Sequence, residues 1–142
     1  MLKLKREGCI QTSVERVLAD FLDHENLDQF FNAKFRIVKD ASQDTLRGGA
    51  GCIREVSILG VTFHEEIISA DERGIVYRVL GNFPVSKHRG HISFRADQNK
   101  TFVSYEIQCK ANWYLPSFIL TPLLTRDLKN CLQLLKQKYA AN

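Results

Sequence analysis

The chain contains 142 residues, of which 44 % are apolar and 25 % charged, and its net charge is +4. These values are typical of one soluble globular domain, predicted here to span residues 1–142, and no apolar run approaches the roughly 20 residues that cross a bilayer. The basic residues are scattered, which excludes the concentrated patch of a nucleic-acid-binding protein and leaves at most a weak contact with a membrane surface.

The chain begins with a predicted strand, residues 2–11, followed by an amphipathic helix over residues 12–23. Apolar residues recur in this helix at the spacing of one face, namely Val14, Val17, Leu18, Phe21 and Leu22. Thr12 and the glutamate three residues later have the spacing of a capping box. A short second helix is predicted over residues 26–32, with Asn26 as its cap.

From Lys34 onward, β-branched and aromatic residues alternate with polar ones, which is typical of strands. Six strands are predicted, at residues 34–38, 51–58, 62–69, 75–81, 90–94 and 101–109. Because the connections between them are short, we expect the strands to form an antiparallel meander.

A long helix is predicted at the end of the chain, with Thr121 as its N-cap and Pro122 in its first turn. Its apolar residues lie on one face, namely Leu124, Leu128, Cys131, Leu132, Leu135 and Tyr139. A one-sided helix of this length needs a large apolar surface, and the sheet is the only one available. The sequence therefore predicts an α+β fold in which an antiparallel sheet curves around a terminal helix.

The four cysteines are far apart and have apolar neighbours, and no C-x-x-C pair occurs among Cys9, Cys52, Cys109 and Cys131. We expect them to be reduced core residues, with no metal and no cofactor. The N-terminus lacks the apolar run of a secretory signal, so a cytoplasmic protein is expected.

The order of these elements resembles the START-related superfamily (SRPBCC, helix-grip fold), which includes polyketide cyclases and lipid-transfer proteins. The resemblance covers nearly the whole chain and is carried by SVERVLADFLDHENLDQF, GAGCIRE, EEIISADERGIVYRV, GHISF, TFVSYEI and the closing helix. It implies a seven-stranded curved sheet wrapped around the last helix, with an internal cavity between them for an apolar or partly polar small molecule. Phe30 or Phe31 stands where many members carry tryptophan, which alters the shape of the cavity rather than the fold.

Strand alternation indicates which side chains face this cavity, because successive residues point to opposite faces. On the last three strands the inner set is Ile75, Tyr77, Val79, Gly90, Ile92, Phe94, Thr101, Val103, Tyr105, Ile107 and Cys109. His88 shares the inner face and His91 does not, so the two histidines are not expected to share a metal ion. His88 is either a ligand contact or general base, or a histidine hydrogen-bonded to backbone.

Two charged residues interrupt the apolar inner face, Arg54 and Glu65, on strands joined near Gly60. They fall nearly opposite each other, and two buried charges need to pair because desolvating each is costly. They are either a polar anchor for a ligand or a structural ion pair. If the register slips by one residue, His64 and Glu66 become the inward pair.

The segment WYLPSFIL, residues 113–120, is almost wholly apolar, and such a loop is normally buried. In a helix-grip protein it would lie at the cavity entrance, with Trp113, Tyr114, Phe118 and Ile119 as a gate. The alternative is simple packing of the first turn of the helix.

Three functions remain open. The leading hypothesis is a carrier or sequestering protein for a hydrophobic or amphipathic small molecule (a lipid, a polyketide-like molecule or an aromatic). The candidate ligand-binding residues are Arg54, Phe63, Glu65, Tyr77, His88, Phe94, Tyr105, Trp113, Phe118 and Leu124.

The alternative is a polyketide cyclase- or dehydratase-like enzyme that uses the same cavity. Glu65, Tyr77, Tyr105 or His88 would move a proton while Arg54 stabilises an enolate. The third hypothesis is a protein-interaction module.

Overall fold

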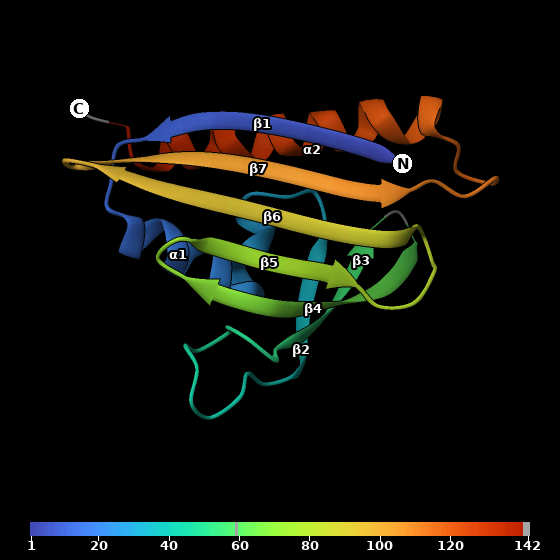
Figure 1. Cartoon of the computed structure of the whole chain (residues 1–142), viewed down its shortest axis with the longest axis horizontal. Helices are drawn as coiled ribbons and strands as arrows, with labels where there is room; N and C mark the ends of the chain where they lie inside the picture. The colour runs from blue at the N-terminus through green and yellow to red at the C-terminus, as the bar shows by residue number, and fades with distance from the viewer. Residues whose placement is uncertain (59, 141–142) are drawn as a thin grey trace.

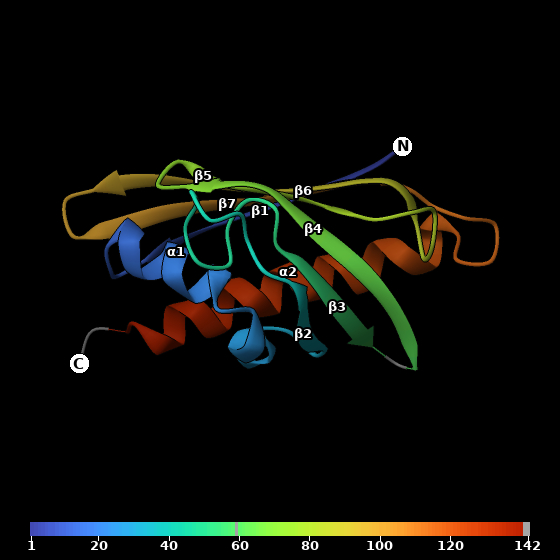
Figure 2. The same cartoon turned by 90° about the horizontal axis from the view of Figure 1, so that it is seen from below.

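One antiparallel sheet and a long C-terminal helix make up most of the chain in the computed structural model, which describes residues 1–58 and 60–140. The seven strands follow the order β1-β7-β6-β5-β4-β3-β2, and the sheet curves over the last helix (Figures 1 and 2). The strands are β1 (Leu2–Ile10), β2 (Lys34–Lys39), β3 (Ile53–Ile58), β4 (Val61–Asp71), β5 (Gly74–Val79), β6 (Ser86–Asp97) and β7 (Lys100–Lys110). The predicted α+β helix-grip architecture is confirmed.

Every neighbouring pair in the sheet is antiparallel, as short turns between period-two segments require. The predicted meander runs from β2 to β7, and β1 closes the order by pairing with β7, so that Leu2 lies opposite Cys109. The register shifts in β2, β4 and β6, and such bulges bend strands. The resulting curvature gives the sheet a concave face that α2 follows (Figure 2).

The first helix, α1 (Val14–Leu22), begins two residues after the start of the predicted range. Its cap is Ser13, whose hydroxyl accepts a hydrogen bond from the amide of Arg16 at 3.4 Å. The predicted cap, Thr12, is instead buried, and its carbonyl accepts a hydrogen bond from the Thr101 hydroxyl at 2.8 Å. Thr12 therefore ties the chain to β7 rather than capping the helix.

The predicted second helix is a 3₁₀ helix, η1 (His24–Gln29), and it ends before Phe30 and Phe31. The prediction over residues 26–32 was therefore misplaced. Phe30 packs its ring against Phe21 of α1, with 6.5 Å between centroids. Packing against the core, rather than helical spacing, fixes these two phenylalanines.

The last helix, α2 (Ser117–Lys138), begins four residues before the predicted cap, Thr121. Pro116 precedes it in an extended conformation, and Pro122 lies inside the helix. A proline cannot donate to the carbonyl four residues before it, which is that of the exposed Phe118, where water can replace the donor. The early start adds a turn that projects at one end of the molecule (Figure 1).

The core is continuous but unevenly filled. Near α1, the ring of Phe21 lies 6.1 Å from that of Phe94 and 6.1 Å from that of Tyr105. Figure 2 shows that α1 covers only one end of the concave face, while α2 runs along both ends. The end without α1 is covered by α2 and by the turn after η1, which contributes Phe31 and Asn32, and the pocket lies there.

Three of the cysteines are buried, Cys52, Cys109 and Cys131, whereas Cys9 is only partly so, and all four are free thiols. No helix within residues 1–58 and 60–140 is long and apolar enough to span a membrane. The domain predicted over residues 1–142 includes residues 59, 141 and 142, which lie outside the described residues.

Candidate functional site

A pocket of about 150 Å³ lies between the concave face of the sheet and the first turns of α2. Most of its walls are apolar, contributed by Phe31, Phe35, Val56, Ile58, Phe63, Val79, Pro84, Val85, Ile107, Cys109, Leu120, Leu124 and Leu128. Its polar groups come from Asn32, Arg54, Glu65, Tyr77, His88, Tyr105 and Asp127. The pocket is thus an apolar container with a few polar groups, as small-molecule sites commonly are.

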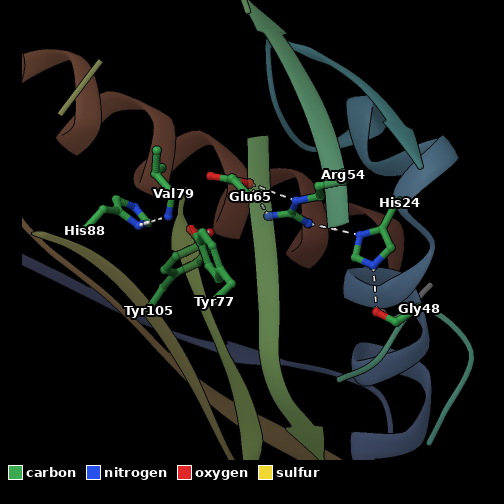
Figure 3. Close-up of polar contacts among 8 residues, drawn as sticks. All are labelled: His24, Gly48, Arg54, Glu65, Tyr77, Val79, His88 and Tyr105. Atoms are coloured by element: carbon green, nitrogen blue, oxygen red, sulfur yellow. Dashed lines mark hydrogen bonds and ion pairs between the residues drawn. The ribbon is translucent and has the colours of Figure 1, made fainter. Parts of the chain in front are cut away.

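Arg54 of β3 and Glu65 of β4 lie directly opposite each other, as predicted, and both are buried. The guanidinium donates from Nε and Nη2 to Oε1 of Glu65, at 2.8 and 2.6 Å. The alternative register is excluded, because His64 and Glu66 face outward, and Glu66 pairs with Arg78 at 2.8 Å. Figure 3 shows the second carboxylate oxygen of Glu65 turned away from Arg54, toward the side of Val79 and His88.

Arg54 is held from several sides. Its guanidinium carbon lies 5.3 Å from the ring centre of Phe35 and 5.1 Å from that of Tyr77, so aromatic faces cover the cation. Its Nη1 donates to Nδ1 of His24 at 3.0 Å. Because Glu65, His24 and two aromatic rings contact it from different sides, the Arg54 guanidinium is held in place at the wall of the pocket.

His24 is a functional candidate that sequence reasoning missed. It is 1 % exposed, and because Nδ1 accepts from Arg54, the neutral ring carries its proton on Nε2 and donates to the Gly48 carbonyl at 2.7 Å (Figure 3). Burial, and then the Arg54 cation, lower the pKa of His24 to about 4. No local pattern identifies His24, since its partners are 24 and 30 residues away.

Two tyrosine hydroxyls meet beside the ion pair. Tyr77 and Tyr105 are hydrogen-bonded to each other at 2.5 Å, and burial raises the pKa of both well above the ordinary value. A side chain at Gly90 would collide with the Tyr77 ring, since a Cβ there would lie 2.3 Å from ring atoms. The glycine therefore makes room for the tyrosine pair, which stays protonated and is suited to donating hydrogen bonds.

His88 makes the backbone hydrogen bond that was one of the two roles left open by the sequence, and its side chain also borders the pocket. Its Nδ1 accepts a hydrogen bond from the Val79 amide at 3.1 Å, which leaves the proton of the neutral ring on Nε2. Burial lowers its pKa, so the ring is neutral near pH 7. His91 is exposed on the other face of β6, where it contacts the Ser93 hydroxyl at 3.3 Å, so the two imidazoles do not meet.

Seven of the ten candidate residues border the pocket, namely Arg54, Phe63, Glu65, Tyr77, His88, Tyr105 and Leu124. Phe94 faces inward but packs on Phe21 in the filled part of the core. Trp113 and Phe118 are 90 % and 79 % exposed, so the expectation that their segment is buried was wrong. The early start of α2 places Phe118 on the solvent side of the helix.

Other lining residues were missed by the sequence reasoning. Asn32 and Phe35 reach the pocket from the turn after η1 and from β2, which no face assignment covered. Asp127 comes from α2, and burial raises the pKa of its carboxyl group. A signal for Asp127 exists, because it lies between Leu124 and Leu128 on the apolar stripe of the helix.

The sequence matches a protein family over residues 1–140, and the family is described as polyketide cyclase / dehydrase and lipid transport. The chain belongs to this family. Comparison with curated proteins gives no match.

Solved structures similar to this polyketide cyclase/dehydrase and lipid transport family member include a START superfamily protein from Mycobacterium smegmatis, with 14 % identity, a TM-score of 0.77 and 96 % of each chain covered. Another is XoxI from Bacillus cereus, with 16 % identity, a TM-score of 0.73, and coverage of 98 % of this chain and 96 % of that chain. A third is the Aha1 dimer from Colwellia psychrerythraea, with 14 % identity, a TM-score of 0.70 and the same coverage. At these identities the likeness shows the shared fold alone.

Proposed function

We propose that this protein binds one small, mainly apolar molecule in the pocket and carries or sequesters it. The observation that carries the proposal is an apolar pocket that contains both a hydrogen-bond acceptor, on Glu65, and a donor, on His88. Membership of a family described by cyclisation, dehydration and lipid transport supports a ligand of this class.

The volume of the pocket limits the part of the ligand that is enclosed. An apolar cavity of about 150 Å³ in another protein admits benzene, so the present volume of about 150 Å³ suits a single ring or a short branched chain. A longer lipid or a multi-ring polyketide needs more room. A neighbouring groove of about 490 Å³ provides it, since Phe31, Asn32, Ile58 and Asp127 line both spaces.

The polar groups favour a neutral ligand with a hydroxyl. Arg54 and Glu65 balance each other's charge, so a ligand carboxylate would add an unpaired negative charge beside Glu65. A hydroxyl both donates and accepts, and therefore suits the outer Glu65 oxygen together with Nε2–H of His88. A phenol or a ring alcohol fits both the volume and this pattern.

A cyclase- or dehydratase-like reaction is the second candidate, favoured by the carboxylate and two neutral hydroxyls in one pocket. Glu65 would take a proton from the carbon beside a ligand carbonyl, and the Tyr77–Tyr105 pair would hydrogen-bond to the enolate oxygen formed. Carrying ranks first because Arg54 already occupies Oε1 of Glu65 with two contacts and holds the carboxylate in place.

The test begins with native mass spectrometry of freshly purified protein, to identify any copurifying molecule. Titrations followed by NMR then use benzene, p-cresol and benzoate. We expect p-cresol to bind best, and His88→Phe to weaken p-cresol about fivefold through one lost hydrogen bond while benzene changes little. The matched control is His91→Phe on the outer face of the same strand, which should change neither.

Absence of any copurifying molecule together with no binding of the three compounds would overturn the proposal. Binding that persists in folded Val79→Phe protein, where the new ring occupies the pocket, would also contradict it. Conversion of a bound ketone, lost in Glu65→Gln protein that still binds p-cresol, would favour the enzyme instead.

A further inference from the structure

Six exposed apolar side chains gather at the end of the molecule where the pocket lies, and we call them the end patch: Phe83, Trp113, Tyr114, Phe118, Ile119 and Leu123. They come from the loop between β5 and β6 and from the connection between β7 and α2 with the first turns of that helix. Each is at least 42 % exposed. Soluble proteins rarely leave so many large apolar groups together without a use for them.

The end patch is held together by defined contacts. The ring of Phe83 stacks on that of Tyr114, with 6.0 Å between centroids, and Trp113 meets Tyr114 edge to face at 5.7 Å. Asn112 links the two segments, because its side-chain amide donates to the carbonyls of Asn82 and Pro84 at 3.1 and 2.7 Å. The hydrogen bonds of Asn112 therefore hold the two segments together, with the three rings exposed to solvent.

The charge at this end is mainly positive. Residues 80–89 and 109–126, which form the end patch and its surroundings, contain four cations and neither aspartate nor glutamate, and the next residue, Asp127, is partly buried and borders the pocket. The four, Lys87, Arg89, Lys110 and Arg126, are exposed, and none pairs with a carboxylate within residues 1–58 and 60–140. The β4–β5 and β6–β7 turns, at the opposite end in Figure 1, are mixed in charge, with Asp71, Glu72 and Asp97 beside Arg73 and Lys100.

We propose that the end patch docks on the surface of a bilayer that contains anionic lipid. Tryptophan and tyrosine favour the interface between headgroups and acyl chains, phenylalanine and leucine side chains enter below it, and lysine and arginine attract anionic headgroups. A second copy of the chain is a poorer occupant, because facing patches would oppose cations to cations. Charge complementarity therefore selects the lipid surface.

The end patch is continuous with the pocket. Pro84, Leu120 and Leu124 line the pocket, and their chain neighbours Phe83, Ile119 and Leu123 belong to the end patch. Docking would bring this end of the pocket to the lipid surface, where an apolar ligand partitions. This step rests on the proposed function, and it identifies a bilayer as the place from which the ligand is taken or to which it is delivered.

The test uses the sole tryptophan of the chain, which lies in the end patch and is 90 % exposed. Vesicles of phosphatidylcholine with 30 mol % phosphatidylglycerol, a roughly one-third anionic surface, are added to the intact protein at low salt. We expect the Trp113 emission to shift to shorter wavelength, brominated lipid to quench it, and the protein to sediment with the vesicles. Pure phosphatidylcholine should give a weaker response, and high salt should reduce binding to the anionic vesicles.

Matched variants separate charge from apolar contact. Lys87→Gln and Lys110→Gln should each weaken binding about fivefold, whereas Lys39→Gln and Lys100→Gln, at exposed lysines elsewhere, should not. Phe118→Gln should weaken binding about tenfold, with Val38→Gln, at an apolar residue exposed on the edge strand β2, as its control.

An unchanged Trp113 emission with anionic vesicles at low salt would overturn the proposal, as would equal binding to neutral vesicles. A blue shift that depends on protein concentration without vesicles would assign the end patch to self-association instead. Binding of p-cresol is measured on the same samples without vesicles, so failure of the docking proposal remains distinct from failure of the pocket.

Discussion

The concave face of the sheet has two halves that differ in how they are covered. Beside α1 it is filled, because Phe21 contacts Phe94, Tyr105 and Phe30 within 6.5 Å between ring centroids. Beyond the end of α1, α2 and the turn after η1 lie over the sheet, and a pocket remains. Strands β6 and β7 run through both halves, so the position of α1 over them contributes to where the core stays open.

The difference teaches that the buried ion pair lies on the open side. The filled half is mainly aromatic and aliphatic, with the Thr101 hydroxyl bonded to the Thr12 carbonyl, whereas the open half contains Arg54, Glu65 and His88. Polar side chains survive inside a protein only when they are hydrogen-bonded, and each of these three has a partner. The polar groups of the open half are therefore fixed in defined positions.

The largest difference in the free energy of unfolding is expected when a phenylalanine ring is removed from each half in turn. Phe21→Ala removes a ring from the filled half and should lower the free energy of unfolding by about 4 kcal/mol, since a large buried cavity remains. Phe63→Ala, at the pocket wall, should cost only about 1 to 2 kcal/mol, because part of the ring already borders empty space. Urea unfolding of both variants measures the contrast, and equal losses would show that the two halves are packed alike.

The second contrast is between buried and exposed charge. Arg54→Met leaves Glu65 buried without its partner and should cost about 3 kcal/mol or more. Arg36→Met is the control, since the Arg36–Glu55 pair at 3.0 Å joins neighbouring strands at the surface and should be worth less than about 1 kcal/mol. Denaturant unfolding of both variants gives the two losses.

Adding Glu65→Leu to Arg54→Met should recover most of the loss, because an apolar pair needs no charge partner. Failure of the double variant to recover would mean that the pair positions β3 and β4 in a way that apolar side chains do not replace.

The same comparison shows which features of the fold can be predicted from the sequence alone. Period-two patterning predicted the strands and the pairing of Arg54 with Glu65, because a hairpin with a short turn leaves few registers. The fold followed from local patterns and the order of elements. The cap of α1 at Ser13 and the start of α2 at Ser117 were missed, since several polar or proline residues competed as the first position.

The site was predicted only in part, for a different reason. His24 reaches Arg54 across 30 residues, and Asn32 reaches the pocket from the turn after η1, so neither follows from the spacing of its own segment. The burial expected for Trp113 and Phe118 is wrong, because large apolar side chains can also lie at the surface. Long-range contacts and exposed apolar side chains are what a single sequence specifies least directly.

The third expected effect is a pH dependence of stability that arises from His24, the hydrogen-bond partner of Arg54. Its pKa is about 4 in the folded protein against 6.5 for an ordinary histidine, so between these values the unfolded chain binds a proton that the folded chain does not. Stability from this group is complete above pH 6.5 and is lost as pH falls toward 4, by about 2 kcal/mol at pH 5. Urea unfolding of wild-type and His24→Gln protein from pH 7 to pH 4 measures this, and the variant should lose less stability on acidification. Parallel curves for the two proteins would contradict the assignment.

The smallest expected change in stability tests most directly whether the pocket is kept open for a ligand. Val79→Ile adds one methylene group beside the pocket and should raise the free energy of unfolding by at most about 1 kcal/mol, because it buries more apolar surface without displacing a wall. The same methylene removes room from a cavity of about 150 Å³, so p-cresol should bind more weakly. Calorimetric melting and NMR titration of one sample give both quantities. A variant that is more stable and binds less would show that the open half is kept for a ligand at the expense of stability, whereas a loss of stability would mean that the half is already as filled as its side chains allow.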